Sequence, residues 1–197
     1  MSQPGQSART PIERFERLYE ESPDPWNYGS SEYEHEKYAA TLAAIGPGPY
    51  PRALEVGCSI GIFTEMLAPR CGRLVAMDFS PRALGLASKR VGGSSHVELL
   101  QGSFPEEVPS GGWDLIVCSE VLYYLDSDTF VRSLDWLRQQ IAQGTRVVAV
   151  SWRGGAEKEP LRGDWVHDLL ATELGQWHAL DVRHSGYRLD RFDGLRP

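Results

Sequence analysis

Two glycines four residues apart, Gly57 and Gly61, separate an apolar run from an amphipathic segment. Residues 52–56 precede them and residues 62–67 follow, so the sequence predicts a strand, a tight loop and a helix. In α/β proteins this arrangement brings a nucleotide-like ligand to the carboxyl end of a parallel strand. We expect Gly57 to let the backbone pass close to a ligand, and Gly61 to allow close packing of the helix.

The spacing of the loop disfavours a nicotinamide cofactor. The dinucleotide fingerprint requires glycine at positions 57, 59 and 62, and Ser59 and Ile62 stand at two of them. Asp78 ends a second apolar run about twenty residues beyond Gly57, where nucleoside-binding folds place the acidic residue that binds the ribose. A carboxylate accepts protons from both ribose hydroxyls. The loop and Asp78 therefore predict a nucleoside site.

Strands and helices alternate along the rest of the chain, which predicts a parallel sheet covered on both faces. The expected strands are near 52–58, 73–78, 96–101, 113–118 and 145–152. The expected helices are near 62–69, 80–91, 128–142 and 164–174. Two terminal runs, 177–184 and 187–192, predict an antiparallel hairpin. Ser80-Pro81 and Thr10-Pro11 are each typical of a helix start, the second as part of a capping box.

Composition limits the class of protein. The chain of 197 residues has the length of one domain, and we treat 1–197 as a single domain. The net charge of −7 argues against a nucleic-acid partner, whose phosphates require a basic face. Unpaired cysteines and scattered histidines predict no metal site. No signal peptide or membrane-spanning run is evident, so we expect a cytoplasmic monomer or homodimer acting on a small molecule.

Four stretches resemble motifs of the class I S-adenosylmethionine (SAM) methyltransferases. They are 54–61, which carries the E-x-G-x-x-x-G signature, and 75–80, 101–104 and 113–124. The resemblance implies a seven-stranded, mostly parallel, Rossmann-like sheet with helices on both faces and a C-terminal antiparallel hairpin. It also implies SAM as cofactor and S-adenosylhomocysteine (SAH) as product. The flanking blocks 15–38 and 151–170 are similar to the NodS-like family, known for N-methylating the amino sugar of a chitooligosaccharide.

The resemblance, with the positions of the strand ends, gives a set of cofactor-binding candidates. These are Trp26, Tyr28, Glu55, Gly57, Cys58, Ser59, Gly61, Asp78, Phe79, Ser103, Phe104, Ser119, Glu120 and Val121. Ser103 stands where the class often has an acidic residue for the adenine amino group, and a hydroxyl accepts that bond more weakly. Phe104 is expected to pack on the adenine face.

Three residues are candidates for catalysis. Glu120 follows the fourth strand, where a carboxylate would orient an amine or hold the SAM ammonium; the alternative is a carboxylate facing water. Tyr124, with Tyr123, lines the acceptor pocket or belongs partly to the core. His167 lies near a helix N-terminus, which disfavours imidazolium and suits a base. Its alternative is a surface or capping histidine.

Residues 10–45 are expected to form a helical cover that moves over the cofactor. Residues 1–9, which precede it, are expected to be a mobile tail. Trp26, Tyr28 and Tyr33 either close over SAM, where aromatic faces suit a sulfonium cation, or fix the N-terminal helices in place.

The leading functional hypothesis is N-methylation of an amino group on a small, sugar-like acceptor. An O-methyltransferase of a hydroxylated metabolite would have a similar cofactor site. A non-catalytic SAM-binding regulatory module would keep the cofactor motifs without an acceptor site.

Overall fold

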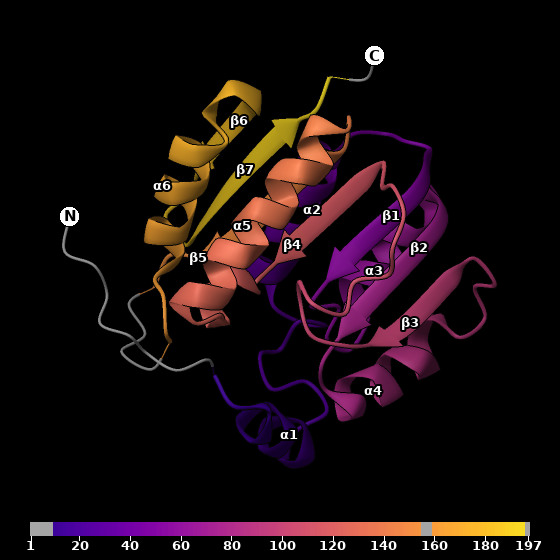
Figure 1. Ribbon diagram of the computed structural model, residues 1–197. Helices are drawn as coiled ribbons and strands as arrows, with labels where there is room; N and C mark the ends of the chain where they lie inside the picture. The colour runs from indigo at the N-terminus through magenta and orange to yellow at the C-terminus, as the bar shows by residue number, and fades with distance from the viewer. Residues whose placement is uncertain (1–9, 155–158, 196–197) are drawn as a thin grey trace.

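The computed structural model describes residues 10–154 and 159–195, so the expected mobile tail lies outside the described residues. Its strands are β1 (Tyr50–Val56), β2 (Cys71–Asp78), β3 (Val97–Gln101), β4 (Leu115–Ser119), β5 (Arg146–Trp152), β6 (His178–Arg183) and β7 (Tyr187–Asp193). They form one sheet in the order β3-β2-β1-β4-β5-β7-β6 (Figure 1). The strands β1 to β5 are parallel, and β7 runs antiparallel to both its neighbours. The predicted fold, with its C-terminal hairpin, is confirmed.

In the described residues the structure has six α-helices and three short 3-10 helices, and the first two α-helices precede the first strand. These helices are α1 (Ile12–Glu21), α2 (Glu32–Ile45), α3 (Ile62–Leu67), α4 (Pro81–Val91), α5 (Ser127–Ala142), α6 (Gly163–Glu173), η1 (Ala68–Arg70), η2 (Leu122–Tyr124) and η3 (Gly175–Trp177). Every predicted helix and strand is present, with ends displaced by a few residues. Within the described part of the chain, no helix is both long and apolar enough to cross a bilayer.

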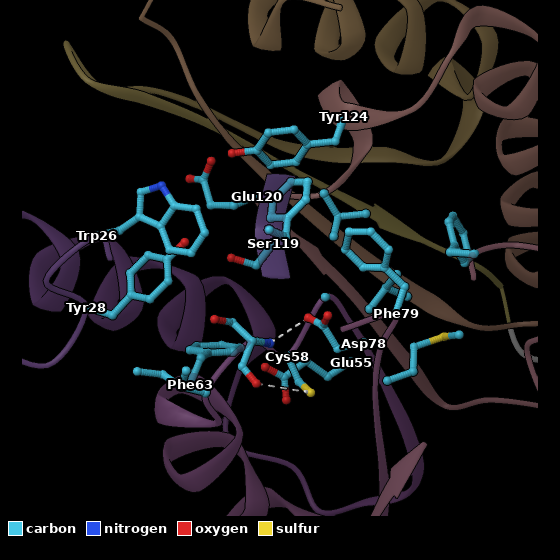
Figure 2. A pocket seen from close by; sticks show the side chains of 18 of the residues that line it. Trp26, Tyr28, Glu55, Cys58, Phe63, Asp78, Phe79, Ser119, Glu120 and Tyr124 are labelled. Atoms are coloured by element: carbon cyan, nitrogen blue, oxygen red, sulfur yellow. Dashed lines mark hydrogen bonds between the residues drawn. The ribbon is translucent and has the colours of Figure 1, made fainter. Parts of the chain in front are cut away.

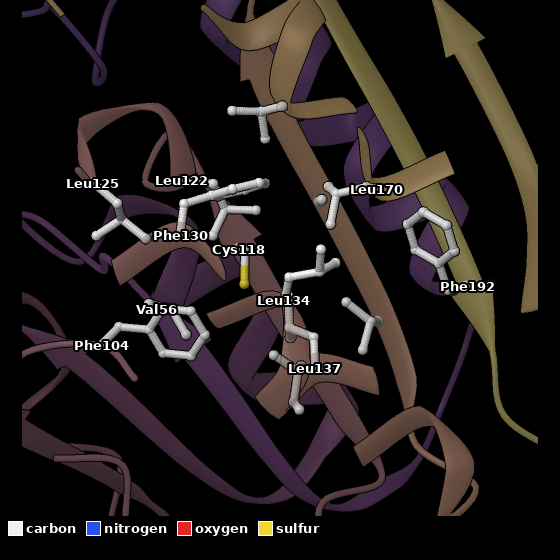
Figure 3. Packing of buried hydrophobic residues seen from close by; sticks show 14 of the residues in the cluster. Val56, Phe104, Cys118, Leu122, Leu125, Phe130, Leu134, Leu137, Leu170 and Phe192 are labelled. Atoms are coloured by element: carbon white, nitrogen blue, oxygen red, sulfur yellow. The ribbon is translucent and has the colours of Figure 1, made fainter. Parts of the chain in front are cut away.

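The alternation of side chains along the strands gives the sheet two apolar faces. Helices α5 and α6 cover one face, where Val56 and Cys118 of the sheet lie near Leu134 of α5 (Figures 1 and 3). The same cluster includes Leu54, Ile116 and Val147. Their neighbours in sequence, such as Leu115 and Val148, point to the other face, which α2, α3 and α4 cover. Helices therefore cover both faces, as the alternating pattern predicts.

The two predicted helix starts have different outcomes. At α4 the prediction is confirmed, because Ser80 Oγ accepts a hydrogen bond from Ala83 N at 3.0 Å and Pro81 is the first helical residue. At α1 the predicted capping box is wrong, since the helix begins at Ile12 with no side-chain cap. The backbone N–H of Thr10 donates instead to Tyr124 O at 3.2 Å, which ties the chain to the segment after β4.

The strand order places a topological switch between β1 and β4. From this point the chain winds outward to β2 and β3 on one side and to β5 on the other. In open α/β sheets the crevice beyond the carboxyl ends of the strands at such a point binds the ligand. Helix α1 lies beyond the carboxyl ends of β1 to β3 (Figure 1). The N-terminal segment therefore reaches the edge of the sheet where a ligand is expected.

Two residues of α5 test the assignment of the core. Leu137 is 0% exposed and Val131 is 51% exposed. We expect Leu137→Ala to lower the free energy of unfolding by about 2–5 kcal/mol, because it leaves a cavity. Val131→Ala should change it by less than about 0.5 kcal/mol. Urea denaturation measures both, and equal losses in the two variants would contradict the packing of α5 described above.

Candidate functional site

A pocket lies at the carboxyl ends of β1, β2 and β4, between the sheet and the N-terminal helices (Figure 2). Most of the predicted site residues line it, namely Trp26, Tyr28, Glu55, Gly57, Cys58, Ser59, Asp78, Phe79, Phe104, Ser119, Glu120, Val121 and Tyr124. Gly61, Ser103 and His167 do not. The sequence therefore brings residues from five separate segments to one place.

The loop after β1 is fixed to the end of β2 by backbone hydrogen bonds. Gly57 N and Cys58 N both donate to Met77 O, at 2.8 and 3.0 Å. Gly57 has φ +77°, and a Cβ there would lie 2.1 Å from Val121 Cγ2. Glycine is therefore required at this position by the neighbouring side chain, whereas the sequence predicted that a ligand requires it. Its expected role in the pocket wall holds.

Gly61 has the packing role that the sequence predicts. It has φ +79°, and a Cβ would lie 3.1 Å from both Cα and Cβ of Ala87 in α4. The start of α3 therefore lies directly against α4. Gly61 does not line the pocket and shapes the loop from behind, so its assignment to the cofactor site stays a prediction.

Asp78 joins the ends of two strands and the start of a helix. Its Oδ2 accepts from Ser59 N and its Oδ1 from Ser80 N, both at 2.9 Å. Burial raises the pKa of Asp78 to about 6, although these N–H groups oppose the rise. A third backbone N–H, that of Phe79, also lowers the pKa of Asp78, and the carboxyl group still borders the pocket. This arrangement suits a pair of neighbouring hydroxyls.

Glu55, at the floor of the pocket, is a second buried carboxyl group. It is 2% exposed, and its Oε2 has no hydrogen-bond partner among the described residues. Burial raises the pKa of Glu55 to about 8. A buried polar atom without a partner is unfavourable, so this group is suited to a ligand that brings a cation or a donor.

Glu120 lies on the opposite wall of the pocket (Figure 2). It follows β4 with φ +56°, a left-handed conformation that is uncommon outside glycine. Its Oε1 accepts from Lys37 Nζ at 2.7 Å. Its Oε2 accepts from the Tyr123 hydroxyl at 2.7 Å and from Trp152 N at 3.0 Å. These contacts contradict the alternative of a carboxylate that faces water.

Lys37 and Glu34 do not line the pocket themselves, but Lys37 holds Glu120 and Glu34 pairs with Lys37, and the sequence analysis missed both. Both belong to α2, and Lys37 Nζ lies 2.9 Å from Glu34 Oε2. Burial lowers the pKa of Lys37, but Glu120 and Glu34 outweigh this and raise it overall. Burial raises the pKa of Glu34. The available signal was the position of Lys37 four residues before Thr41, on the buried face of the helix.

Aromatic residues of the N-terminal segment form another wall. Trp26 and Tyr28 stack with ring centroids 5.4 Å apart (Figure 2). Phe15 of α1 meets Phe79 and Tyr124 edge-on, at 5.1 and 5.0 Å. The two expected roles of these aromatic side chains therefore coincide, since they line the pocket and also fix the helices. Movement of the cover stays a prediction.

Other contacts also hold the N-terminal segment against the sheet. The Tyr19 hydroxyl and Ser59 Oγ form a hydrogen bond at 2.6 Å, and Ser80 Oγ donates to Glu16 Oε1. Tyr33 does not line the pocket. Its hydroxyl donates to Gly186 O at 2.9 Å, in the turn between β6 and β7. Tyr33 therefore fixes α2 to the terminal hairpin, which is the second of its two expected roles, and its closure over the ligand stays a prediction.

His167 does not lie in the pocket, which contradicts its prediction as the base. It is 0% exposed, and its Nδ1 bonds to Asp190 Oδ2 at 2.5 Å. Burial alone would raise the pKa of Asp190, but His167, Arg188 and His178 lower it. The N-terminal position of His167 in α6 was predicted correctly. The face it occupies was not, because it points toward β7.

Ser103 lies in a cavity beside the main pocket. The two cavities share Thr10, Phe79 and Gly102. The N–H of Ser103 donates to Glu107 Oε2 at 2.8 Å, and Glu107 also lines the second cavity. The acidic side chain of Glu107 is therefore present beside Ser103, although Glu107 follows it by four residues in the chain.

The contact between Gly57 and Val121 gives a testable prediction. We expect Gly57→Ala to lower the free energy of unfolding by about 2–5 kcal/mol, from backbone strain and overpacking together. Combining it with Val121→Ala should restore about 1–3 kcal/mol of the expected additive loss, because the clash is removed. Gly85→Ala, where a Cβ meets nothing within 4 Å, is the control. Strictly additive losses in chemical denaturation would contradict the steric account.

Comparison with known proteins places this architecture in a family. The model of the family described as Nodulation protein S (NodS) matches residues 14–156. Nodulation protein S of Sinorhizobium fredii is 36% identical over 127 residues, which cover 63% of this chain and 59% of that protein. The corresponding protein of Bradyrhizobium diazoefficiens is 42% identical over 103 residues, covering 52% and 49%. The chain thus spans about half the length of the curated relatives it matches.

A solved structure is similar over a longer part of the chain. It is the crystal structure of the N-methyltransferase NodS from Bradyrhizobium japonicum WM9 in complex with SAH. The TM-score is 0.78 at 26% identity, and the match covers 94% of this chain and 99% of that chain. Because the family model covers most of the chain and the fold agrees throughout, the protein belongs to the NodS family.

Proposed function

We propose that this protein transfers a methyl group from SAM to an amino group of a small acceptor. The observation that carries the proposal is the hydrogen bond from Ser59 N to Asp78 Oδ2. It joins the glycine loop to the carboxylate that is expected to bind the ribose, and both line one pocket. Glu120 and Tyr124 lie at the other end of the same pocket. Family membership and the SAH-bound relative support the same activity.

The residues of the pocket fit the parts of SAM. Asp78 would accept the two ribose hydroxyls, and Phe79 and Phe104 offer apolar faces to the adenine. The ammonium group would meet the Glu55 carboxyl, whose Oε2 has no partner among the described residues. Once bound, SAM supplies a methyl group on a sulfonium that is open to attack by a nucleophile. The protein must then position the acceptor and exclude water.

Glu120 is the group best placed to handle the acceptor. Its carboxylate is held by three donors and lines the pocket, so it can accept a hydrogen bond from an amine N–H. The amine nitrogen is then oriented, and Glu120 can take up the proton that the new ammonium must lose. Burial raises the pKa of Tyr124 to about 12, so this residue acts as a neutral donor or a wall.

The same geometry favours an amine over a hydroxyl acceptor. An alcohol must lose its proton as it attacks, which calls for a stronger base than an amine needs. Among the described residues that line the pocket, none is a histidine. We therefore place O-methylation second and the regulatory module third. The proposed acceptor is a small, sugar-like amine. We also propose that the protein acts in the cytoplasm as a monomer or a homodimer.

SAH affinity should depend on the charge of Asp78. Since the pKa of Asp78 is raised to about 6, the carboxylate that accepts the hydroxyls is lost as the pH falls through this value. We expect affinity to weaken by about tenfold at one pH unit below it. Asp78→Asn, which keeps the shape, should bind about 10–100-fold more weakly at neutral pH.

The matched control is the pH dependence of the variant itself. Asp78→Asn cannot titrate, so its SAH affinity should lose the tenfold change attributed to this group. Calorimetry at several pH values measures both proteins. Unchanged affinity in Asp78→Asn at neutral pH would reject the ribose assignment.

Methyl transfer is tested with two acceptors that differ only in their amine. We expect label from methyl-labelled SAM to appear on a glucosamine tetramer and not on its fully N-acetylated counterpart, as read by mass spectrometry. Replacing Glu120 by Gln should lower kcat by about 100-fold or more, the range expected for loss of a proton acceptor. Methylation of the acetylated tetramer at oxygen would instead establish the O-methyltransferase.

A further inference from the structure

Lys37 is a cation in the interior of the protein. Its side chain is 2% exposed, although it belongs to a helix on the outside of the sheet. Burial of an unpaired ammonium is strongly unfavourable, so a lysine persists in such a place only with close partners. A lysine on a helix face that is open to water would need no such partners. The position of Lys37 therefore requires a specific explanation.

The partners of Lys37 connect the N-terminal helix to the pocket. Nζ donates to Glu120 Oε1 at 2.7 Å and to Glu34 Oε1 at 3.0 Å. It also lies 5.2 Å from the centre of the Tyr33 ring. An ammonium has three donors, and these three groups surround it. Lys37 is thus the direct link between α2 and the carboxylate at the end of β4.

Glu120 has little freedom once these contacts form. A carboxylate has roughly four acceptor positions. Lys37, Tyr123 and Trp152 N fill three of them, which leaves about one for a ligand in the pocket that Glu120 lines. The backbone of Glu120 has φ +56°, and a strained conformation of this kind persists when its surroundings fix it. The contacts therefore set the orientation of the Glu120 carboxylate and the number of hydrogen bonds that it can still accept from a ligand.

We propose that Lys37 is the positioning residue for Glu120 in the acceptor site, holding its side chain so that the one remaining acceptor position meets the acceptor amine. The inference rests on the proposed methyl transfer. It also assigns a substrate preference, because two carboxylates around one ammonium leave an excess of negative charge. Such a site selects an acceptor whose nitrogen carries protons to donate, and it disfavours an anionic acceptor.

A purely structural role is the competing explanation. In that case Lys37 serves only to pair Glu34 and fix α2, and its loss would lower the amount of folded protein without acting through Glu120. A double-mutant cycle distinguishes the two, because a residue that acts through another has no further effect once the other is gone.

The experiment uses the full chain with the glucosamine tetramer as acceptor. We expect Lys37→Met to lower kcat/KM for the tetramer about 10–100-fold, mainly through a higher KM, and to leave the Kd for SAH within about twofold. In the Glu120→Gln background the same change should have less than about a twofold effect. Lys37→Arg, which keeps the charge, should recover part of the loss. Lys89→Met, on the exposed face of α4, is the matched control.

A second variant covers the case in which Lys37→Met does not fold. Lys37→Met with Glu34→Gln removes the pair together and keeps the charge of the cluster, and it should show the same rise in the acceptor KM. Equal effects of Lys37→Met in both backgrounds, or a loss of SAH affinity as large as the loss for the tetramer, would overturn the proposal. If the wild-type protein binds SAH but methylates no amine, the proposed function fails first, and the acceptor role of Lys37 fails with it.

Discussion

The buried carboxylate of Asp78 connects the elements that form the pocket at the carboxyl ends of the strands. Asp78 accepts from Ser59 N in the loop after β1 and from Ser80 N at the start of α4, while its own backbone ends β2. The Asp78 carboxylate therefore helps to fix the shape of the glycine loop, together with the backbone hydrogen bonds to Met77 O. Burial makes the ionised form unfavourable, which raises the pKa of Asp78 to about 6. A buried carboxylate of this kind is stabilised when two hydroxyl groups of a ligand donate hydrogen bonds to it.

The N-terminal helices complete a site that the sheet begins. The sheet supplies the cofactor side of the pocket, with Glu55, Asp78 and the glycine loop. Helix α1 and the aromatic residues after it supply a wall, and α2 supplies Lys37, which fixes Glu120. This division explains why the family similarity begins at residue 14, well before the first strand. We propose that this N-terminal segment is part of the acceptor site and also excludes water from it.

Local patterns were sufficient to predict the fold and most of the residues that line the pocket. The alternation of strands and helices, the two glycines and Asp78 each have a signal that lies within a short stretch of sequence. His167 was misassigned because its position near a helix start is local, whereas its partner Asp190 comes from β7. Lys37 was missed for the same reason, since Glu120 lies eighty-three residues away. Thr10 shows this as well, because a contact with Tyr124 replaced a cap that the local pattern favoured.

We propose that one pocket holds the cofactor on Asp78 and places it beside the Glu120 carboxylate, which Lys37 fixes. A crystal structure with SAH tests it most directly. We expect both ribose hydroxyls on the Asp78 carboxylate, the SAH ammonium beside Glu55, and the sulfur facing the side of the pocket formed by Glu120 and Tyr124. The contact between Lys37 and Glu120 should be retained. A ribose bound away from Asp78, or a sulfur turned away from Glu120, would contradict the account.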